Sequence, residues 1–193
     1  MVATVEHGRA HRKSWDLDWD VHSLTFSTFQ RQAFFRGKRT PQWFLEVIAR
    51  ARRRCPFHLF AYVVMPEHVH LVLQPLPGVR MRSVLWQLKR PMTERVLSWA
   101  RVHRPGLLVR MRDSQPSGKT THRFWQRGGG YDRNLRSPSD VHEKIAYNHD
   151  NPVRRGLVDH AENWPFSSAA EWITGRKGPV PIDWDHLPEP ELR

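Results

Sequence analysis

The chain has 193 residues, with 31 Lys and Arg against 19 Asp and Glu, so its formal net charge at pH 7 is +12. This length predicts one domain, and because Cys55 is the single cysteine, an internal disulfide and a CxxC-type zinc site are excluded. The charge excess predicts attraction to a polyanion, and nucleic acid is favoured over a membrane because no run of about 18 apolar residues occurs.

The chain divides by composition into an arm, a domain and a tail. Residues 1–20 are predicted to be a mobile basic arm, residues 21–170 the domain and residues 171–193 a C-terminal tail. The first residues lack the apolar segment of a secretory signal, and a lone cysteine suits a reducing compartment. We therefore expect a cytoplasmic, nucleoid-associated protein.

The first half of the domain contains signals for strands and one helix. Residues 22–29 alternate in polarity and are rich in β-formers, which predicts a strand. An amphipathic helix follows, with Thr40 as the predicted N-cap and Pro41 at the first helical position. Two short apolar runs, residues 57–64 and 68–75, then have the pattern of a β-hairpin.

The second half adds two helical segments and a short strand. Residues 80–103 have helical periodicity, although Pro91 predicts a kink or a split into two helices. Residues 104–121 are expected to be a mobile connection, residues 122–136 a short strand near a triple glycine, and residues 138–150 a helix. The order β-α-β-β-α-β predicts an α+β, ferredoxin-like fold, an antiparallel sheet with helices on one face.

Two histidines lie two residues apart in the second strand of the predicted hairpin. Alternation along a strand places His68 and His70 on the same face, roughly 7 Å apart along the strand. Neutral imidazoles in this arrangement can bind one divalent cation if a third ligand comes from another element. Alternatively, the two rings pack against a helix, since 12 histidines make this spacing common by chance.

Tyr147 and Asn151 are four residues apart on the last predicted helix, so they share one face of it. A phenol beside a metal-bound phosphate can act as a nucleophile and form a phosphotyrosine, and Asn151 can supply the missing oxygen ligand. The alternative is that Tyr147 is a packing residue and that Asn151 ends the helix before Pro152.

Four segments, in order, resemble the HUH-type single-tyrosine transposases of insertion sequences, specifically the REP-associated tyrosine transposases: YVVMPEHVHLVL, FWQRGGGYDR, YNHDNPVRRGLV and WPFSS. The resemblance spans roughly residues 20–170. It implies a ferredoxin-like HUH nuclease domain that cleaves single-stranded DNA beside hairpins, keeps the 5′ phosphate on tyrosine and releases a 3′ hydroxyl. Matched by position, it implies His68, His70 and Asn151 as metal ligands and Tyr147 as the nucleophile.

Two positions depart from the family pattern. Gly130 stands where many members have tyrosine, which affects stacking on DNA or strand packing but not the chemistry, and Pro91 falls within a helix. Tyr131 is a rival nucleophile, but it follows a flexible glycine run, whereas Tyr147 has the family's spacing to the Asn-Pro-Val segment.

Cations interleaved with aromatic residues favour binding of single-stranded DNA, because guanidinium groups contact phosphates and flat rings stack on bases. The alternative is that these cations are solvated and that the tryptophans belong to the core. The predicted DNA-binding residues are Arg52, Arg53, Arg54, Lys89, Arg90, Arg123, Trp125, Arg127 and Arg133.

The sequence thus predicts a DNA nickase and strand transferase that depends on Mg²⁺ or Mn²⁺, with the two imidazoles favouring the softer Mn²⁺. Its expected partner is single-stranded DNA with REP-like hairpins, and the expected oligomeric state is a monomer or a homodimer. A non-catalytic, hairpin-binding regulator is the alternative. A metal-dependent nucleotide hydrolase is less favoured, because the chain lacks a longer HxHxH run.

Overall fold

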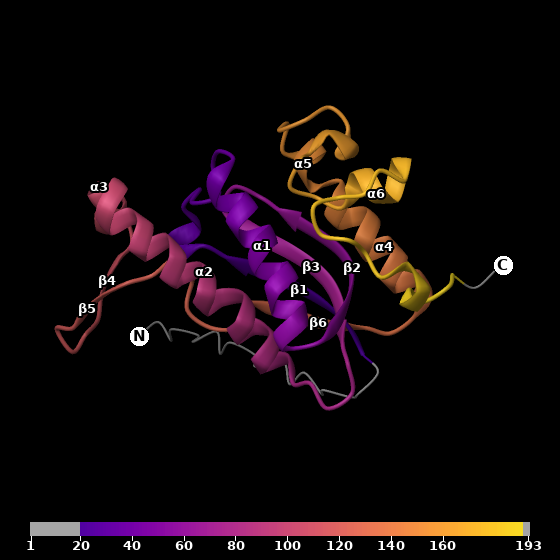
Figure 1. Ribbon diagram of the computed structural model, residues 1–193, viewed down its shortest axis with the longest axis horizontal. Coiled ribbons are helices and arrows are strands. Elements are labelled where there is room, and N and C mark those ends of the chain that lie inside the picture. The colour runs from indigo at the N-terminus through magenta and orange to yellow at the C-terminus, as the bar shows by residue number, and fades with distance from the viewer. Residues whose placement is uncertain (1–19, 191–193) are drawn as a thin grey trace, which may run out of the picture.

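The computed structural model describes residues 20–190. At its centre is an antiparallel sheet of four strands in the order β2-β3-β1-β6 (Figure 1). The strands are β1 (Val21–Ser27), β2 (Phe57–Val64), β3 (His68–Pro75) and β6 (Tyr131–Leu135). Helix α1 (Arg39–Arg54) joins β1 to β2, and α2 (Met81–His103) follows β3. This topology confirms the predicted ferredoxin-like fold.

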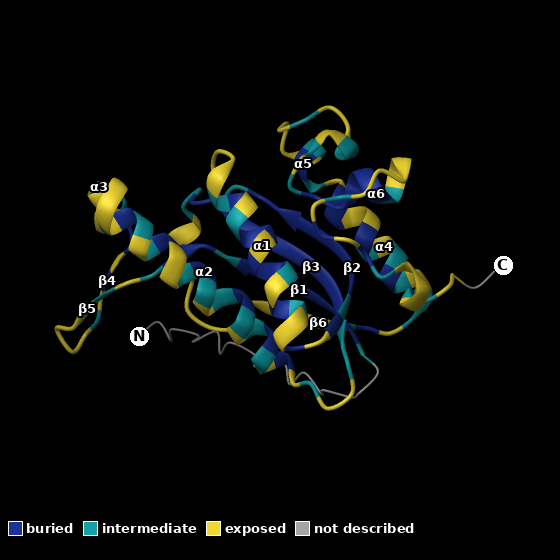
Figure 2. Ribbon diagram, in the orientation of Figure 1, coloured by how far each residue is buried: buried dark blue, intermediate teal, exposed yellow. Residues whose placement is uncertain are grey.

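Helices cover both faces of the sheet. Leu24 and Phe26 of β1 belong to a core that also contains the buried sides of α1 and α2. On the other face a smaller core joins Phe60 and Val72 to Ile145 of α4 (Pro138–His149). Figure 2 shows the sheet buried between these layers. The prediction that helices lie on one face of the sheet therefore holds for α1 and α2, whereas α4 lies on the opposite face.

Helix α1 forms where expected but begins two residues earlier, at Arg39 with Lys38 as the N-cap. The prediction that Thr40 is the N-cap is wrong, because its hydroxyl donates to the carbonyl oxygen of Phe34 at 2.8 Å. The apolar side of α1 is buried against the sheet and α2. Its buried residues are Pro41, Phe44, Leu45, Val47, Ile48 and Ala51.

Helix α2 is continuous over 23 residues, so the predicted split at Pro91 is wrong. Buried residues recur along one side of the helix both before and after the proline, from Val84 to Ala100. The carbonyl of Lys89, in the turn before Pro91, accepts hydrogen bonds from the hydroxyl of Thr93 at 2.9 Å and from an indole at 3.0 Å. Packing on both sides of the proline therefore outweighs its local cost.

The segment 104–121, expected to be a mobile connection, contains regular structure. It comprises helix α3 (Pro105–Arg110), strand β4 (Arg112–Ser114) and the start of β5 (Thr120–His122). The fully buried Met111 anchors α3, and β4 and β5 pair as a hairpin. Figure 1 shows this hairpin projecting away from the sheet beyond α2.

The C-terminal residues pack on the domain. Asp183 accepts two hydrogen bonds from Arg52 at 2.6 Å and one from the backbone amide of Leu59 at 2.7 Å. The remaining helices are short and are α5 (Asn151–Arg154), α6 (Ala169–Thr174), η1 (Phe29–Arg31), η2 (Ala161–Asn163) and η3 (Trp184–His186). The predicted basic arm falls, apart from residue 20, outside the described residues. Among residues 20–190, no helix has the length and apolarity needed to cross a membrane.

Candidate active site

The two histidines of β3 lie on one face of the sheet, as predicted from their spacing. Strand β1 runs beside them, with Thr25 opposite His70 and Ser27 opposite His68. Both imidazoles are 7% exposed, and their Nε2 atoms are 2.9 Å apart. The two rings therefore present their outer nitrogens to the same point.

Each inner ring nitrogen is held by an oxygen. Nδ1 of His68 lies 3.0 Å from Oε1 of Glu67, and Nδ1 of His70 lies 2.8 Å from Oγ1 of Thr25. An ionised carboxylate only accepts, so Glu67 fixes the proton of His68 on Nδ1 and leaves Nε2 with a lone pair. The Thr25 hydroxyl can donate or accept, so it supports His70 in either tautomer. Oxygen partners of this kind orient histidines that bind metals.

The spacing of the Nε2 atoms suits a shared cation. Two nitrogens bound at about 2.1 Å to one ion and at right angles to each other are separated by roughly 3 Å, close to the observed distance. Within the described part of the chain, no group of three His, Cys, Asp or Glu side chains could hold an ion. A third protein ligand would therefore be an amide or a backbone oxygen, with water or phosphate in the remaining positions. Oxygen ligands suit Mg²⁺ or Mn²⁺, whereas the two imidazoles favour softer divalent ions.

Burial keeps both imidazoles neutral. It lowers the pKa of His70 to about 3, with further lowering from the nearby His68, Lys144 and Arg154. Burial also lowers the pKa of His68, although Glu67 opposes the shift. Both side chains are therefore in the cation-binding form at neutral pH without losing a proton.

Burial alone would raise the pKa of Glu67, but His68 and Arg155 lower it further than burial raises it. Arg155 donates to Oε1 of Glu67 at 2.9 Å. The carboxylate is thus held ionised beside His68, where it accepts a hydrogen bond from Nδ1 of the imidazole.

Helix α4 presents Tyr147 with its side chain half exposed. The guanidinium carbon of Arg154 lies 3.9 Å from the centre of the tyrosine ring, and Nζ of Lys144 lies 4.6 Å from it. The same two cations act electrostatically on His70. The phenol and the histidines therefore share a positively charged region, which suits a phosphate group.

Asn151 does not direct its amide oxygen to the histidines in this structure. Its Oδ1 accepts from Arg154 at 3.0 Å, while its Nδ2 donates to the carbonyl oxygens of Tyr147 and Asn148 at 3.2 Å. The amide thus binds the last carbonyls of α4, although the C-cap of that helix is Asp150 and Asn151 begins α5.

Asn148 is a residue that the sequence analysis missed. It follows Tyr147 on α4, is 1% exposed, and neither amide atom has a hydrogen-bond partner. Burying an unpaired amide is costly, so a group of this kind needs an explanation. The sequence contains a possible signal, a second Asn within the motif that carries Tyr147, but only the fold shows that it is buried.

Comparisons with known proteins show similarity to transposases. Residues 19–104 match the family described as "Transposase IS200 like". A REP-associated tyrosine transposase of Escherichia coli is 29% identical over 144 residues, which are 74% of this chain and 72% of that protein. The chain is similar to REP-associated tyrosine transposases.

Two further REP-associated tyrosine transposases extend the comparison. One, from Haemophilus influenzae and named putative, is 24% identical over 144 residues, 72% of each chain. The other is a solved structure described as a REP-associated tyrosine transposase bound to a REP hairpin. It has a TM-score of 0.65 and 20% identity, covering 96% of this chain and all of that one. At this identity the likeness establishes the shared fold.

Two of the residues predicted to bind DNA have structural partners within the protein. Trp125 is 6% exposed and packs against Phe26 and Phe124 in the core. Arg52 is held by Asp183. The fold thus engages both side chains, Trp125 in the core and Arg52 in an ion pair.

The other predicted DNA-binding residues are exposed or half-buried cations. Arg123 and Arg127 both pair with Asp113, which lowers the pKa of that carboxyl. The Asp113 side chain is nearly buried, whereas about a third of Arg123 and half of Arg127 remain exposed. The rest of this set is Arg53, Arg54, Lys89, Arg90 and Arg133.

Proposed function

We propose that the chain is a metal-dependent endonuclease and strand transferase that cleaves single-stranded DNA beside hairpins. The observation that carries this proposal is the paired Nε2 atoms of His68 and His70, each ring held by an oxygen, on the sheet face that α4 covers with Tyr147. A pair of packing histidines would not require both rings to be oriented in this way.

The phenol of Tyr147 would attack the phosphorus of a phosphodiester. A bond forms between Oη and phosphorus while the bond from phosphorus to O3′ breaks, the phenol gives up its proton, and O3′ gains one to leave as a 3′ hydroxyl. Because one phosphodiester replaces another, no water or nucleotide is consumed, and attack by a second 3′ hydroxyl reverses the step and joins strands.

Lys144 and Arg154, which flank the tyrosine ring, would bind the phosphate oxygens and orient the phosphorus toward Oη. His68 and His70 would hold Mg²⁺ or Mn²⁺, which when bound polarises the phosphate and stabilises charge on the leaving oxygen. Asn151 remains the predicted third ligand, a role that requires its amide to leave Arg154 and rotate.

The proposed partner is single-stranded DNA that folds into REP-like hairpins. The net charge of +12 supports a polyanionic substrate, and the solved relative was bound to a REP hairpin. The protein would act in the cytoplasm on nucleoid DNA, as a monomer or a homodimer.

A library of labelled hairpins with single-stranded flanks, incubated with Mg²⁺ or Mn²⁺, tests this function. Wild-type protein should cleave some members, and both Tyr147→Phe and the double variant His68→Ala/His70→Ala should lose cleavage but retain hairpin binding. Equal loss of binding and cleavage in the histidine variant would contradict the proposal, since the histidines would then serve folding.

A non-catalytic regulator that binds hairpins is the second candidate. It is favoured by the position of Asn151, whose amide oxygen accepts from Arg154. It is also favoured because, within residues 20–190, no group of three His, Cys, Asp or Glu side chains could hold an ion. Tight hairpin binding with no cleavage of any library member, at any concentration of either cation, would establish this candidate instead.

A further inference from the structure

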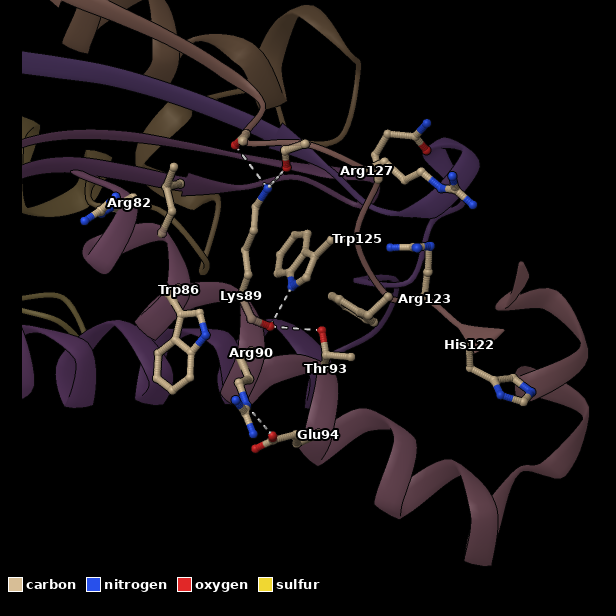
Figure 3. Close-up of a pocket in the computed structure, with 15 residues that line it drawn as sticks. Arg82, Trp86, Lys89, Arg90, Thr93, Glu94, His122, Arg123, Trp125 and Arg127 are labelled. Atoms are coloured by element: carbon tan, nitrogen blue, oxygen red, sulfur yellow. Dashed lines mark hydrogen bonds and ion pairs between the residues drawn. The ribbon is translucent and has the colours of Figure 1, made fainter. Parts of the chain in front are cut away.

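A pocket of about 630 Å³ lies between α2 and the segment 122–129 (Figure 3). It is on the opposite face of the sheet from the histidines. Lys89, which lines it, approaches the ring of Phe26 at 4.8 Å, whereas the neighbouring Thr25 faces His70. The pocket is therefore separate from the candidate active site, and the proposed chemistry does not use it.

One wall of the pocket is aromatic and exposed. Trp86 is 51% exposed on the outer side of α2, with the guanidinium carbon of Arg90 at 4.9 Å from its ring centre. Trp125 and Phe124, which are buried, line the inner side. A large flat ring left half in water beside an apolar lining is a typical site for stacking a planar group.

The pocket is also rich in cations. Besides Lys89 and Arg90, its lining includes Arg82, Arg123 and Arg127, with Glu94 as the single acid. The ammonium group of Lys89 donates to the carbonyl oxygens of Gly128 and Gly129 at 2.8 and 3.0 Å (Figure 3), which accounts for two of its three donors. Burial lowers the pKa of Lys89 to about 8, so a bound anion would compensate for the cost of keeping this charge.

We propose that this pocket binds one unpaired nucleotide of the DNA substrate, with the base stacked on Trp86 and the phosphate held by the surrounding cations. The proposal rests on the proposed function only in taking DNA as the substrate. A flat apolar wall with an excess of positive charge suits a base and its phosphate, and the volume lies in the range of small-ligand sites. Arg90 pairs with Glu94, and Arg123 and Arg127 pair with Asp113, so a bound phosphate would share these cations with the two acids.

The position of the pocket allows one strand to reach both sites. β6 is an edge strand, and only Gly130 separates the pocket-lining Gly129 from Tyr131 at its start. Tyr131 is 43% exposed and pairs with Thr25, the residue that holds His70. Residues 129 and 131 are at most about 7 Å apart along the chain. A strand gripped in the pocket can thus pass around this edge toward the histidines.

The test compares two probes, a DNA hairpin with a single-stranded tail and the same hairpin without the tail. Trp86→Ala should weaken binding of the tailed hairpin by about 5-fold to 100-fold, while Trp86→Phe keeps most of the affinity. Both variants should bind the blunt hairpin within about two-fold of wild type. Arg82→Ala should weaken tail binding more than Arg101→Ala, a matched loss of one exposed cation elsewhere on α2.

Photocrosslinking locates the base directly. With 5-iodouracil placed at successive tail positions, one position should crosslink to peptides containing Trp86 or residues 122–129. Unchanged tail binding in Trp86→Ala, or crosslinks that map only to other peptides, would overturn the pocket. Cleavage measured on the same samples separates the pocket proposal from the proposed catalytic function. If wild-type protein cleaves hairpins and Trp86→Ala still binds tails normally, only the pocket proposal is contradicted. Tail binding through the pocket without any cleavage contradicts the proposed chemistry alone.

Discussion

Replacing Thr25 by Val tests whether the oxygen beside His70 prepares that ring for a cation. The substitution removes the hydroxyl that lies 2.8 Å from Nδ1 of His70 and keeps nearly the same shape. Valine is favoured in strands, and β1 is paired on both sides, so the sheet should be retained. The variant therefore isolates one hydrogen bond.

The substitution should weaken metal binding and also lower the free energy of unfolding. Losing an oxygen partner of a ligating histidine typically lowers metal affinity 10- to 100-fold, about 1.4 to 3 kcal/mol of binding free energy. The imidazole nitrogen left buried without a partner lowers the free energy of unfolding by about 1 to 3 kcal/mol. Titration with Mn²⁺, followed by electron paramagnetic resonance of the free ion, measures the first effect, and urea unfolding measures the second.

Thr25→Ser is the matched control, because it retains the hydroxyl and should bind Mn²⁺ nearly as well as wild type. Wild-type affinity for Mn²⁺ in Thr25→Val, with a loss of stability only, would refute the reasoning. The hydroxyl would then stabilise the fold without orienting a ligand.

Three further variants test other parts of the structure. Trp125→Ala should lower the free energy of unfolding by about 3 to 5 kcal/mol in urea, far more than Trp86→Ala, because only Trp125 is buried; similar losses would contradict its place in the core. The folded pKa of Lys89, about 8, lies below its ordinary 10.5, so the unfolded chain binds more protons between these values. Stability should therefore rise with pH across this window, by at most about 3 kcal/mol, and Lys89→Met should remove that rise; an identical pH profile in the variant would contradict the shift. Asn148→Leu removes an unpaired buried amide, so it should raise the free energy of unfolding by about 1 kcal/mol or more. If the variant also loses cleavage, Asn148 serves the active site. A lower free energy of unfolding would show that the amide is paired.

Local signals predicted the elements that local interactions hold. The hairpin of β2 and β3 follows from two apolar runs separated by three residues, and α4 begins where its cap residues suggest. There the hydroxyl of Ser137 accepts from the backbone amide of Asp140 at 3.2 Å. Pro91 misled the analysis because long-range packing of α2, which a local pattern does not contain, keeps that helix whole.

Only the part of the candidate site that follows from strand periodicity could be predicted from the sequence. Alternation placed His68 and His70 on one face, but the partnership of Thr25 with His70 depends on the register between β1 and β3. Arg52 and Asp183 lie 131 residues apart, so no sequence pattern indicates that this arginine is already paired. Trp125 resembled a DNA-stacking residue because cations flank it in sequence, whereas its ring points into the core.

The central claim is that Tyr147 becomes covalently joined to DNA, and peptide mapping of a protein–DNA adduct tests it most directly. Wild-type protein, incubated with cleavable hairpins and Mg²⁺ or Mn²⁺ and then denatured, should yield a peptide carrying a 5′-phosphorylated DNA fragment on Tyr147. Tyr147→Phe should yield no adduct, while Tyr131→Phe should yield the wild-type product. An adduct that persists in Tyr147→Phe and disappears in Tyr131→Phe would contradict the account and identify Tyr131 as the nucleophile.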